Sequence, residues 1–223
     1  MEIVELRQYV LHPGRRDDLV ALFDREFVEP QETNGLRVIG TFRDLDDPDR
    51  FVWFRGFPDL PARRAGLEAF YDGPVWQTHK HAANATMIDS DDVLLLRPVV
   101  PFADAAGPLV VVTVLPLDQP AENGFMSWFQ TDVEPLLAAA GSPLVALLVT
   151  DSSPNTFPRL PVREGERVLV RVSGFSGEPA FADHQAALQA SAGWSAVAGE
   201  LTRRTRGQEQ VLRLVPTPRS RLR

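Results

Sequence analysis

The 223-residue sequence contains no cysteine, and Lys80 is its only lysine. The lack of cysteine excludes a disulfide scaffold, a cysteine nucleophile, a thiolate metal site and a cysteine-ligated cluster. Long apolar runs are also missing, because the two most apolar stretches, 108–117 and 136–149, are shorter than the ~18 residues of a membrane-spanning helix. The N-terminus shows no basic segment followed by an apolar one. We therefore expect a cytoplasmic protein without a membrane partner.

The charge balance argues against nucleic acid as a partner. The formal net charge is −7, and an acidic surface repels a phosphate backbone. The sequence also lacks a glycine-rich phosphate loop, a G-x-S-x-G elbow and a His-Glu-x-x-His zinc motif. Hydrophobic residues make up 44% of the chain, which is enough for an ordinary packed core.

Hydrophobic periodicity predicts the order strand, helix, strand, strand, helix, strand in each half of the chain. The predicted strands of the first half are 2–11, 35–43, 51–57 and 87–97, and its helices lie near 17–29 and 61–83, the second broken at Gly73-Pro74. In the second half, strands are predicted at 109–115, 144–150, 167–174 and 210–215, with helices at 123–140 and 180–202. This order is typical of the ferredoxin-like unit.

Matched positions indicate that the two halves are repeats. Gly56-Phe57, Trp76 and Leu96 recur 118 residues later as Gly174-Phe175, Trp194 and Leu214. Two helices cover only one face of a four-stranded sheet, so we expect the second repeat to cover the other face. We predict an α+β fold of tandem ferredoxin-like (βαββαβ) repeats whose antiparallel sheets pack as an intrachain α/β barrel. The expected bounds are 1–99 and 108–217, with a linker at 98–107 and a frayed tail at 218–223.

Strand alternation gathers a group of polar and aromatic candidates. Glu5, Arg7 and Tyr9 share one face of the first strand, and Trp53 and Arg55 share one face of the third. We expect all five to face the barrel interior, since the apolar residues of the opposite faces suit the helices. One interpretation is a set of ion pairs that satisfies an interior seam. The other is a pocket in which Arg55 holds a carboxylate or enolate oxygen and Tyr9 donates a proton.

The second repeat lacks most of these polar residues. At the equivalent positions, Thr113 replaces Arg7, Leu115 replaces Tyr9 and Ser173 replaces Arg55. At the position equivalent to Trp53, the second repeat has Arg171. We therefore expect the first repeat to carry the chemistry and the second to form a wall or lid.

Histidine supplies the remaining acid–base candidates. His79 and His81 stand two residues apart, so they do not share a helix face as a metal pair would. For His79, a surface or structural role competes with a catalytic or haem-ligand role. His184 lies in an alanine-rich segment and is expected to be partly exposed. Asp89 to Asp92 alternate between two strand faces, so no metal site is expected there.

Four segments of the first half carry a family resemblance: ELRQYVLHPG (5–14), FVWFRGFPD (51–59), FYDGPVW (70–76) and ANATMIDSDDVLLLRP (83–98). With these segments the chain resembles the NIPSNAP family over residues 2–99, and the second half resembles it only in outline. The resemblance implies the dimeric α/β-barrel form of the ferredoxin-like fold and leaves a homodimer open. It says little about chemistry, because the wider superfamily includes monooxygenases, isomerases, polyketide cyclases and haem enzymes. His12 departs from the pattern, since the family commonly has lysine there.

Three functions are consistent with these features. The favoured one is a small-molecule enzyme of the kind found in biosynthesis. It would use cofactor-independent proton transfer on a carbonyl-containing, largely apolar metabolite, as a cyclase, isomerase or lyase does. The alternatives are a protein that binds haem or another flat apolar ligand without turnover, and an interaction protein without a site. The predicted catalytic residues are Tyr9, Arg55 and His79. The predicted substrate-binding residues are Glu5, Arg7, Trp53, Trp76, Asn84 and Arg171.

Overall fold

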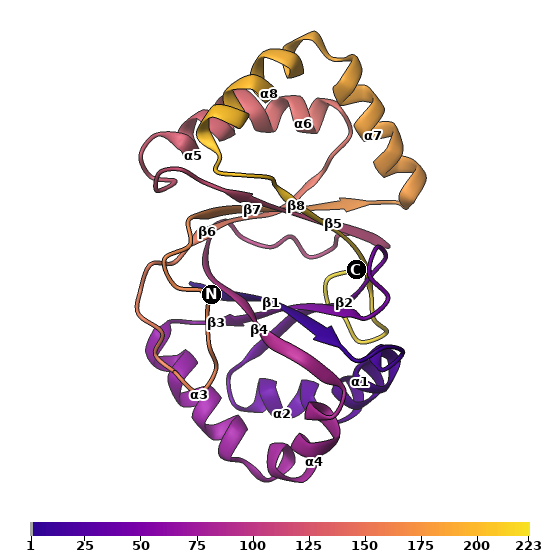
Figure 1. Ribbon diagram of the computed structural model, residues 1–223, viewed down its shortest axis with the longest axis vertical. Helices are drawn as coiled ribbons and strands as arrows, with labels where there is room; N and C mark the ends of the chain where they lie inside the picture. Colours follow the sequence, from indigo (N-terminus) through magenta and orange to yellow (C-terminus); the bar gives the residue numbers. More distant parts are fainter. Residues whose placement is uncertain (1) are drawn as a thin grey trace. The chain divides into compact units, whose positions relative to one another are not determined.

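The computed structural model describes residues 2–223 as alternating strands and helices (Figure 1). The strands are β1 (Ile3–Leu11), β2 (Arg37–Asp44), β3 (Arg50–Phe57), β4 (Met87–Val100), β5 (Leu109–Pro116), β6 (Leu144–Thr150), β7 (Val168–Phe175) and β8 (Gln210–Pro216). The helices are α1 (Arg16–Leu22), α2 (Val28–Thr33), α3 (Leu60–Asp72), α4 (Pro74–Asn84), α5 (Phe125–Trp128), α6 (Glu134–Ala139), α7 (Glu178–Ala190) and α8 (Ala192–Arg204), with π-helical turns η1 (Phe23–Phe27) and η2 (Phe129–Val133). The strand order is that of a closed antiparallel barrel, β1-β3-β2-β8-β5-β7-β6-β4, which confirms the predicted fold class.

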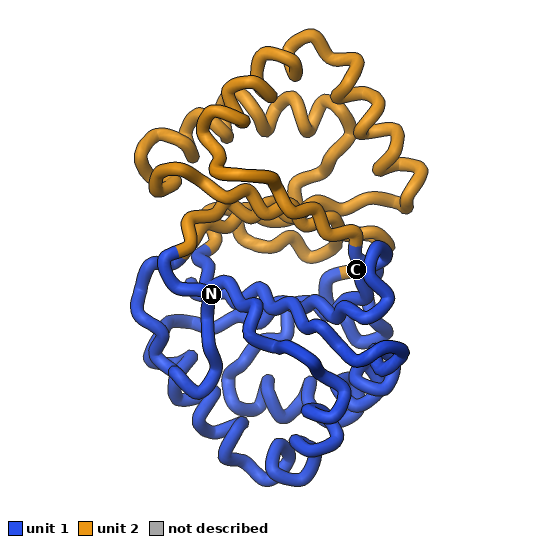
Figure 2. The backbone as a smooth tube through the Cα atoms, viewed as in Figure 1, with its two compact units in different colours: residues 1–97, 151–165, 214–222 blue, residues 98–150, 166–213, 223 orange. Residues whose placement is uncertain are grey.

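The chain divides into two compact units that do not follow the predicted boundaries (Figure 2). Unit 1 comprises the residues up to Arg97 together with 151–165 and 214–222, and unit 2 comprises 98–150, 166–213 and Arg223. Part of the expected linker is strand, because β4 continues to Val100. The expected frayed tail is instead packed in unit 1: Leu222 is buried, and its N–H donates to the carbonyl oxygen of Ile39 at 3.0 Å.

In unit 1, helices α1 to α4 cover one face of the sheet in which β1 lies between β3 and β4 (Figure 1). The strand register places Glu5 opposite Arg55 and Arg7 opposite Trp53. Tyr9 and Trp53 belong to the hydrophobic core beneath the helices. The predicted orientation of these five residues is therefore wrong, since their side chains face the helices and not the barrel interior.

The physical reason for this reversal is visible in the aromatic residues. Phe23 and Phe27 of the helical layer make edge-on ring contacts there, with Phe23 at 4.9 Å from Trp53 between ring centroids. The opposite strand face carries Val4 and Leu6, which are both fully buried. Because both faces are buried, alternation separates the two sets of residues without telling which set meets the helices.

Helices α3 and α4 begin where local chemistry favours it. Asp59 caps α3, its side chain accepting a hydrogen bond from the N–H of Ala62 at 2.7 Å. Pro74 opens α4 at a position where its missing N–H costs nothing. A Cβ atom on Gly73 would lie 2.7 Å from the carbonyl oxygen of Ala69, so the tight break between the helices requires glycine. The break predicted at Gly73-Pro74 is thus confirmed.

Unit 2 repeats this arrangement in detail. β7 pairs with β5 and β6, and helices α5 to α8 with η2 lie over one face of this sheet (Figure 1). The register of β5 and β7 places Val111 opposite Ser173 and Thr113 opposite Arg171, which matches the pairing of β1 with β3. A β-bulge follows Leu144 in β6, as one follows Val38 in β2. The π-helical turns η1 and η2 likewise fall at matching positions.

Candidate functional sites

A single buried carboxylate organises the polar cluster of unit 1. Oε2 of Glu5 accepts hydrogen bonds from Nη1 of Arg7 at 3.0 Å and from Nε and Nη2 of Arg55 at 3.0 and 2.6 Å. Oε1 accepts from Nε of Arg63 in α3 at 2.7 Å. Burial alone would raise the pKa of Glu5, but the charges of the three guanidinium groups outweigh it and hold that pKa well below 4.5. The interpretation as paired interior charges therefore fits the geometry.

The other contacts of this cluster explain how it is held. Nε of Arg7 donates to the hydroxyl oxygen of Tyr9 at 3.0 Å, and Nη1 of Arg55 donates to Oε1 of Gln31 at 3.1 Å. Nη1 of Arg63 donates to Asn155 and Thr156, both in the segment 151–165. Sequence reasoning missed Arg63, because a helix position distant in sequence gives no alternation signal for contact with β1.

A small cavity of about 30 Å³ lies beside this cluster. Its lining includes Tyr9, Trp53 and Trp76, so these three predicted site residues come together. Burial raises the pKa of Tyr9 above its usual 10, so the hydroxyl stays protonated near neutral pH. The other predicted residues of unit 1 lie outside the lining. Glu5, Arg7 and Arg55 form the cluster beside it, Nε2 of His79 is 3.4 Å from Oε2 of Glu26, and Asn84 is exposed at the end of α4. Their roles at a ligand site stay predictions.

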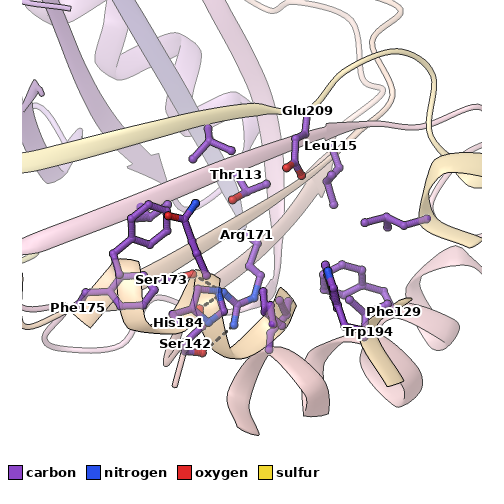
Figure 3. Close-up of a pocket in the computed structure, with 18 residues that line it drawn as sticks. Thr113, Leu115, Phe129, Ser142, Arg171, Ser173, Phe175, His184, Trp194 and Glu209 are labelled. Atoms are coloured by element: carbon purple, nitrogen blue, oxygen red, sulfur yellow. Dashed lines mark hydrogen bonds between the residues drawn. The ribbon is translucent and has the colours of Figure 1, made fainter. Parts of the chain in front are cut away.

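A larger cavity of about 150 Å³ lies in unit 2, between its sheet and its helices (Figure 3). Apolar protein cavities of about this volume bind benzene, so the space suits a molecule with one six-membered ring. Figure 3 shows Ser142, Ser173 and His184 gathered around Arg171, with the aromatic rings of Phe129 and Trp194 further along the lining. The site therefore combines a polar end with an apolar wall.

The repeat comparison explains why unit 2 holds the larger cavity. Thr113 and Ser173 line it at the positions that Arg7 and Arg55 fill in unit 1. Short side chains at these matching positions leave space that long side chains occupy in the first repeat. The sequence already showed these replacements as a loss of polarity, whereas in the structure they are also a loss of volume.

Arg171, a predicted substrate-binding residue, lines this cavity and has all its N–H groups engaged. Nε and Nη2 donate to the two carboxylate oxygens of Glu134 at 2.8 and 2.7 Å. Nη2 also donates to the carbonyl oxygen of Ser142 at 2.9 Å, and Nη1 donates to the hydroxyl oxygens of Ser142 and Ser173. A ligand therefore meets the serine hydroxyls more readily than the guanidinium group itself.

His184 on α7 is buried in the wall of this cavity, so its predicted partial exposure is wrong. Nδ1 lies 3.1 Å from the carbonyl oxygen of Ala140. Because a carbonyl only accepts hydrogen bonds, Nδ1 carries the hydrogen, and in the neutral ring Nε2 keeps its lone pair. Burial lowers the pKa of His184 below 6.5, and the charge of Arg171 lowers it further. The ring is therefore neutral at pH 7.

Comparison with known families identifies the first repeat. Residues 4–103 match the family model NIPSNAP. Residues 4–103 are a NIPSNAP domain. The match ends near the close of β4, so the NIPSNAP domain covers the first four strands, including those that carry the Glu5 cluster. No curated protein matches the sequence.

Solved structures similar to this chain extend the comparison beyond the NIPSNAP domain. A candidate monooxygenase from Lactobacillus acidophilus is 13% identical, with 96% of this chain and 93% of that chain covered and a TM-score of 0.61. A second candidate monooxygenase, from Fusobacterium nucleatum, is 10% identical over 96% and 91% of the two chains, with a TM-score of 0.61. An anthrone oxidase-like protein is 12% identical over 97% and 91%, with a TM-score of 0.58. These similarities show a shared fold over nearly the whole chain.

Two general features complete the description of the sites. Among residues 2–223, no group of three or more histidine, aspartate or glutamate side chains is arranged to hold a metal ion. Within the same residues, no helix has the length and apolar character needed to span a membrane.

Proposed function

We propose that the protein is a small-molecule enzyme that moves a proton on a carbonyl-containing, largely apolar ligand in the unit 2 cavity. The observation that carries this proposal is that the imidazole of His184 and the hydroxyl groups of Ser142 and Ser173 line the same cavity of about 150 Å³. This keeps the reaction class expected from the sequence but assigns it to the second repeat. The two solved structures named as candidate monooxygenases have this fold, which supports a role in small-molecule chemistry.

The hydroxyl groups of Ser142 and Ser173 would receive the carbonyl oxygen of the ligand. Each hydroxyl oxygen accepts a hydrogen bond from Arg171, and neither hydroxyl hydrogen has an acceptor among the described residues. Hydrogen bonding to a cation polarises a hydroxyl group and strengthens it as a donor. Two such donors would stabilise the negative charge that develops on an enolate oxygen.

His184 would act as the base. Nε2 takes a proton from the carbon next to the carbonyl, the electrons of the broken C–H bond form a C=C bond, and the carbonyl π electrons move to the oxygen. The resulting enolate is held by Ser142 and Ser173. Delivery of the proton from Nε2 to a different carbon completes an isomerisation, whereas its replacement on Nε2 by a solvent deuteron, followed by return to the same carbon, gives exchange. The neutral ring and its lowered pKa suit this base role at neutral pH.

The test uses cyclohexanone, a single-ring ketone, as the probe. Exchange of its α-hydrogens for deuterium in D₂O is followed by proton NMR with wild-type protein, His184→Gln and Ser173→Ala. We expect wild type to accelerate exchange over buffer, His184→Gln to lose the acceleration, and Ser173→Ala to lower the rate by about 10²-fold. His81→Gln, an exposed histidine in unit 1, should retain the full rate.

Two outcomes would overturn the proposal. If wild type does not accelerate exchange over buffer, the cavity does not perform this chemistry on a ketone of matching size. If His79→Gln abolishes exchange while His184→Gln retains it, the first repeat carries the chemistry, as the sequence alone suggested.

A further inference from the structure

We propose that the small cavity of unit 1 is a binding site for one halide-sized inorganic anion such as chloride. The cavity has a volume of about 30 Å³, which admits a single ion or one to two water molecules. It is separate from the unit 2 cavity, and the proposal does not depend on the proposed reaction.

Charge is the first reason. The cluster beside the cavity contains one carboxylate, Glu5, and three guanidinium groups, so its formal charge is +2. All four side chains are buried, with exposures of 0 or 1%. An excess of buried positive charge is costly unless a counter-ion offsets it. The guanidinium carbons of Arg7 and Arg55 lie 5.7 and 4.9 Å from the ring centre of Trp53, which lines the cavity.

The hydrogen-bonding groups of the lining are the second reason. Nε1 of Trp53 is buried and has no partner among the described residues. The hydroxyl oxygen of Tyr9 accepts from Arg7, and Oε1 of Gln31 accepts from Arg55, so these acceptors are already engaged. Because both contacts use oxygen atoms as acceptors, the Tyr9 hydroxyl hydrogen and the Gln31 amide hydrogens are left to be donated. The lining therefore presents donors in excess.

An anion satisfies such a lining better than water does. A water molecule that accepts hydrogen bonds must also place two hydrogens of its own, and the remaining lining is mostly apolar, including Phe23, Phe27 and Phe70. A monatomic anion accepts several hydrogen bonds and donates none. It would also offset part of the +2 charge of the neighbouring cluster.

The first experiment locates the ion. Crystals grown with gluconate as the only monovalent anion are soaked in sodium bromide, and anomalous scattering is measured at the bromine absorption edge. We expect a bromide peak among Trp53, Tyr9 and Gln31. Density for water alone, without a bromide peak, would overturn the proposal.

The second experiment measures binding in solution. Chloride replaces gluconate at constant ionic strength, and the melting temperature is recorded for wild type, Trp53→Phe and Trp194→Phe. Trp53→Phe keeps an aromatic ring and removes the N–H donor. We expect this change to raise the chloride concentration that gives half of the melting-temperature shift by about tenfold. Trp194→Phe makes the same chemical change in unit 2, at the tryptophan that matches Trp76, and should respond as wild type does. Equal responses of all three proteins would reject the site.

Discussion

Removal of the Glu5 carboxylate gives the sharpest test of the unit 1 cluster. Glu5→Gln keeps the shape of the side chain but leaves Arg7, Arg55 and Arg63 without their shared anion. The formal charge of the buried cluster rises from +2 to +3. Breaking a buried ion pair by removing one partner typically costs 3–5 kcal/mol, so we expect a loss of about 3–5 kcal/mol in the free energy of unfolding. For a chain of this length that corresponds to a fall of about 6–20 °C in melting temperature.

Urea unfolding followed by circular dichroism measures this loss. Two substitutions serve as controls. Glu68→Gln removes an exposed carboxylate, with 47% of its side chain accessible, and should change stability by less than about 0.5 kcal/mol. Glu134→Gln removes a carboxylate with 16% exposure and only one arginine partner, so its cost should fall between the two.

The pH dependence of the free energy of unfolding provides a second test of Glu5→Gln. The pKa of Glu5 is lowered on folding, so the stabilisation it gives is complete above about pH 4.5 and is lost as the pH falls below that value. The acid-induced loss of stability should therefore be smaller in Glu5→Gln than in wild type. A Glu5→Gln protein within about 1 kcal/mol of wild type, with an unchanged acid profile, would refute the reasoning.

Three further predictions concern unit 2. Because the pKa of His184 is lowered on folding, stability should decline as the pH falls below 6.5, and thermal unfolding of His184→Gln should lack this decline; identical profiles would contradict it. Thr113→Leu should fill part of the cavity and abolish cyclohexanone exchange without lowering the melting temperature, and retained exchange would place the reaction elsewhere. A Cβ at Gly174 would lie 1.8 Å from the carbonyl oxygen of Ala106, so Gly174→Ala should cost at least about 1–3 kcal/mol in urea unfolding. In helix α8, a Cβ on Gly199 would meet only Nη1 of Arg203, at 3.8 Å, so Gly199→Ala should stabilise by about 0.5–1 kcal/mol. A cost similar to that of Gly174→Ala would show that the close contact is not the cause.

Local sequence patterns predicted the elements and the repeat well. The strands and helices follow the period of the apolar residues. The matches 118 residues apart fall on equivalent elements, namely β3 and β7, α4 and α8, and β4 and β8. Gly73-Pro74 ends one helix and starts the next through backbone chemistry alone. These features depend on neighbours in sequence, which is why the sequence reveals them.

The orientation of the site residues could not be predicted in the same way. Alternation joined Glu5, Arg7 and Arg55 correctly, yet both strand faces are buried and so both looked suitable for the helices. The better signal was aromatic: Tyr9 and Trp53 lie on the polar side of the strands, and the helical segments carry the phenylalanines that pack against them. Arg63 could not be predicted as a partner of Glu5, because a contact between distant segments produces no periodic pattern in the sequence.

The unit 2 cavity was overlooked for a different reason. Ser142 and His184 come from a loop and a helix that no motif connects, and each is unremarkable in its own segment. The sequence shows that Thr113 and Ser173 replace Arg7 and Arg55. Their small size predicts a cavity only when the surrounding side chains are known not to fill the space.

The division of unit 1 into three chain segments means that the repeats cannot be dissected at residues 98–107. A fragment that stopped there would hold Arg63 without the oxygens of Asn155 and Thr156. It would also leave β2 without its pairing to Leu214–Pro216. A polypeptide with one repeat would need a second copy to supply these parts, and association of the two copies would become less favourable on dilution. Joining the repeats in one chain supplies them at a fixed effective concentration, so the completed unit is independent of how dilute the protein is.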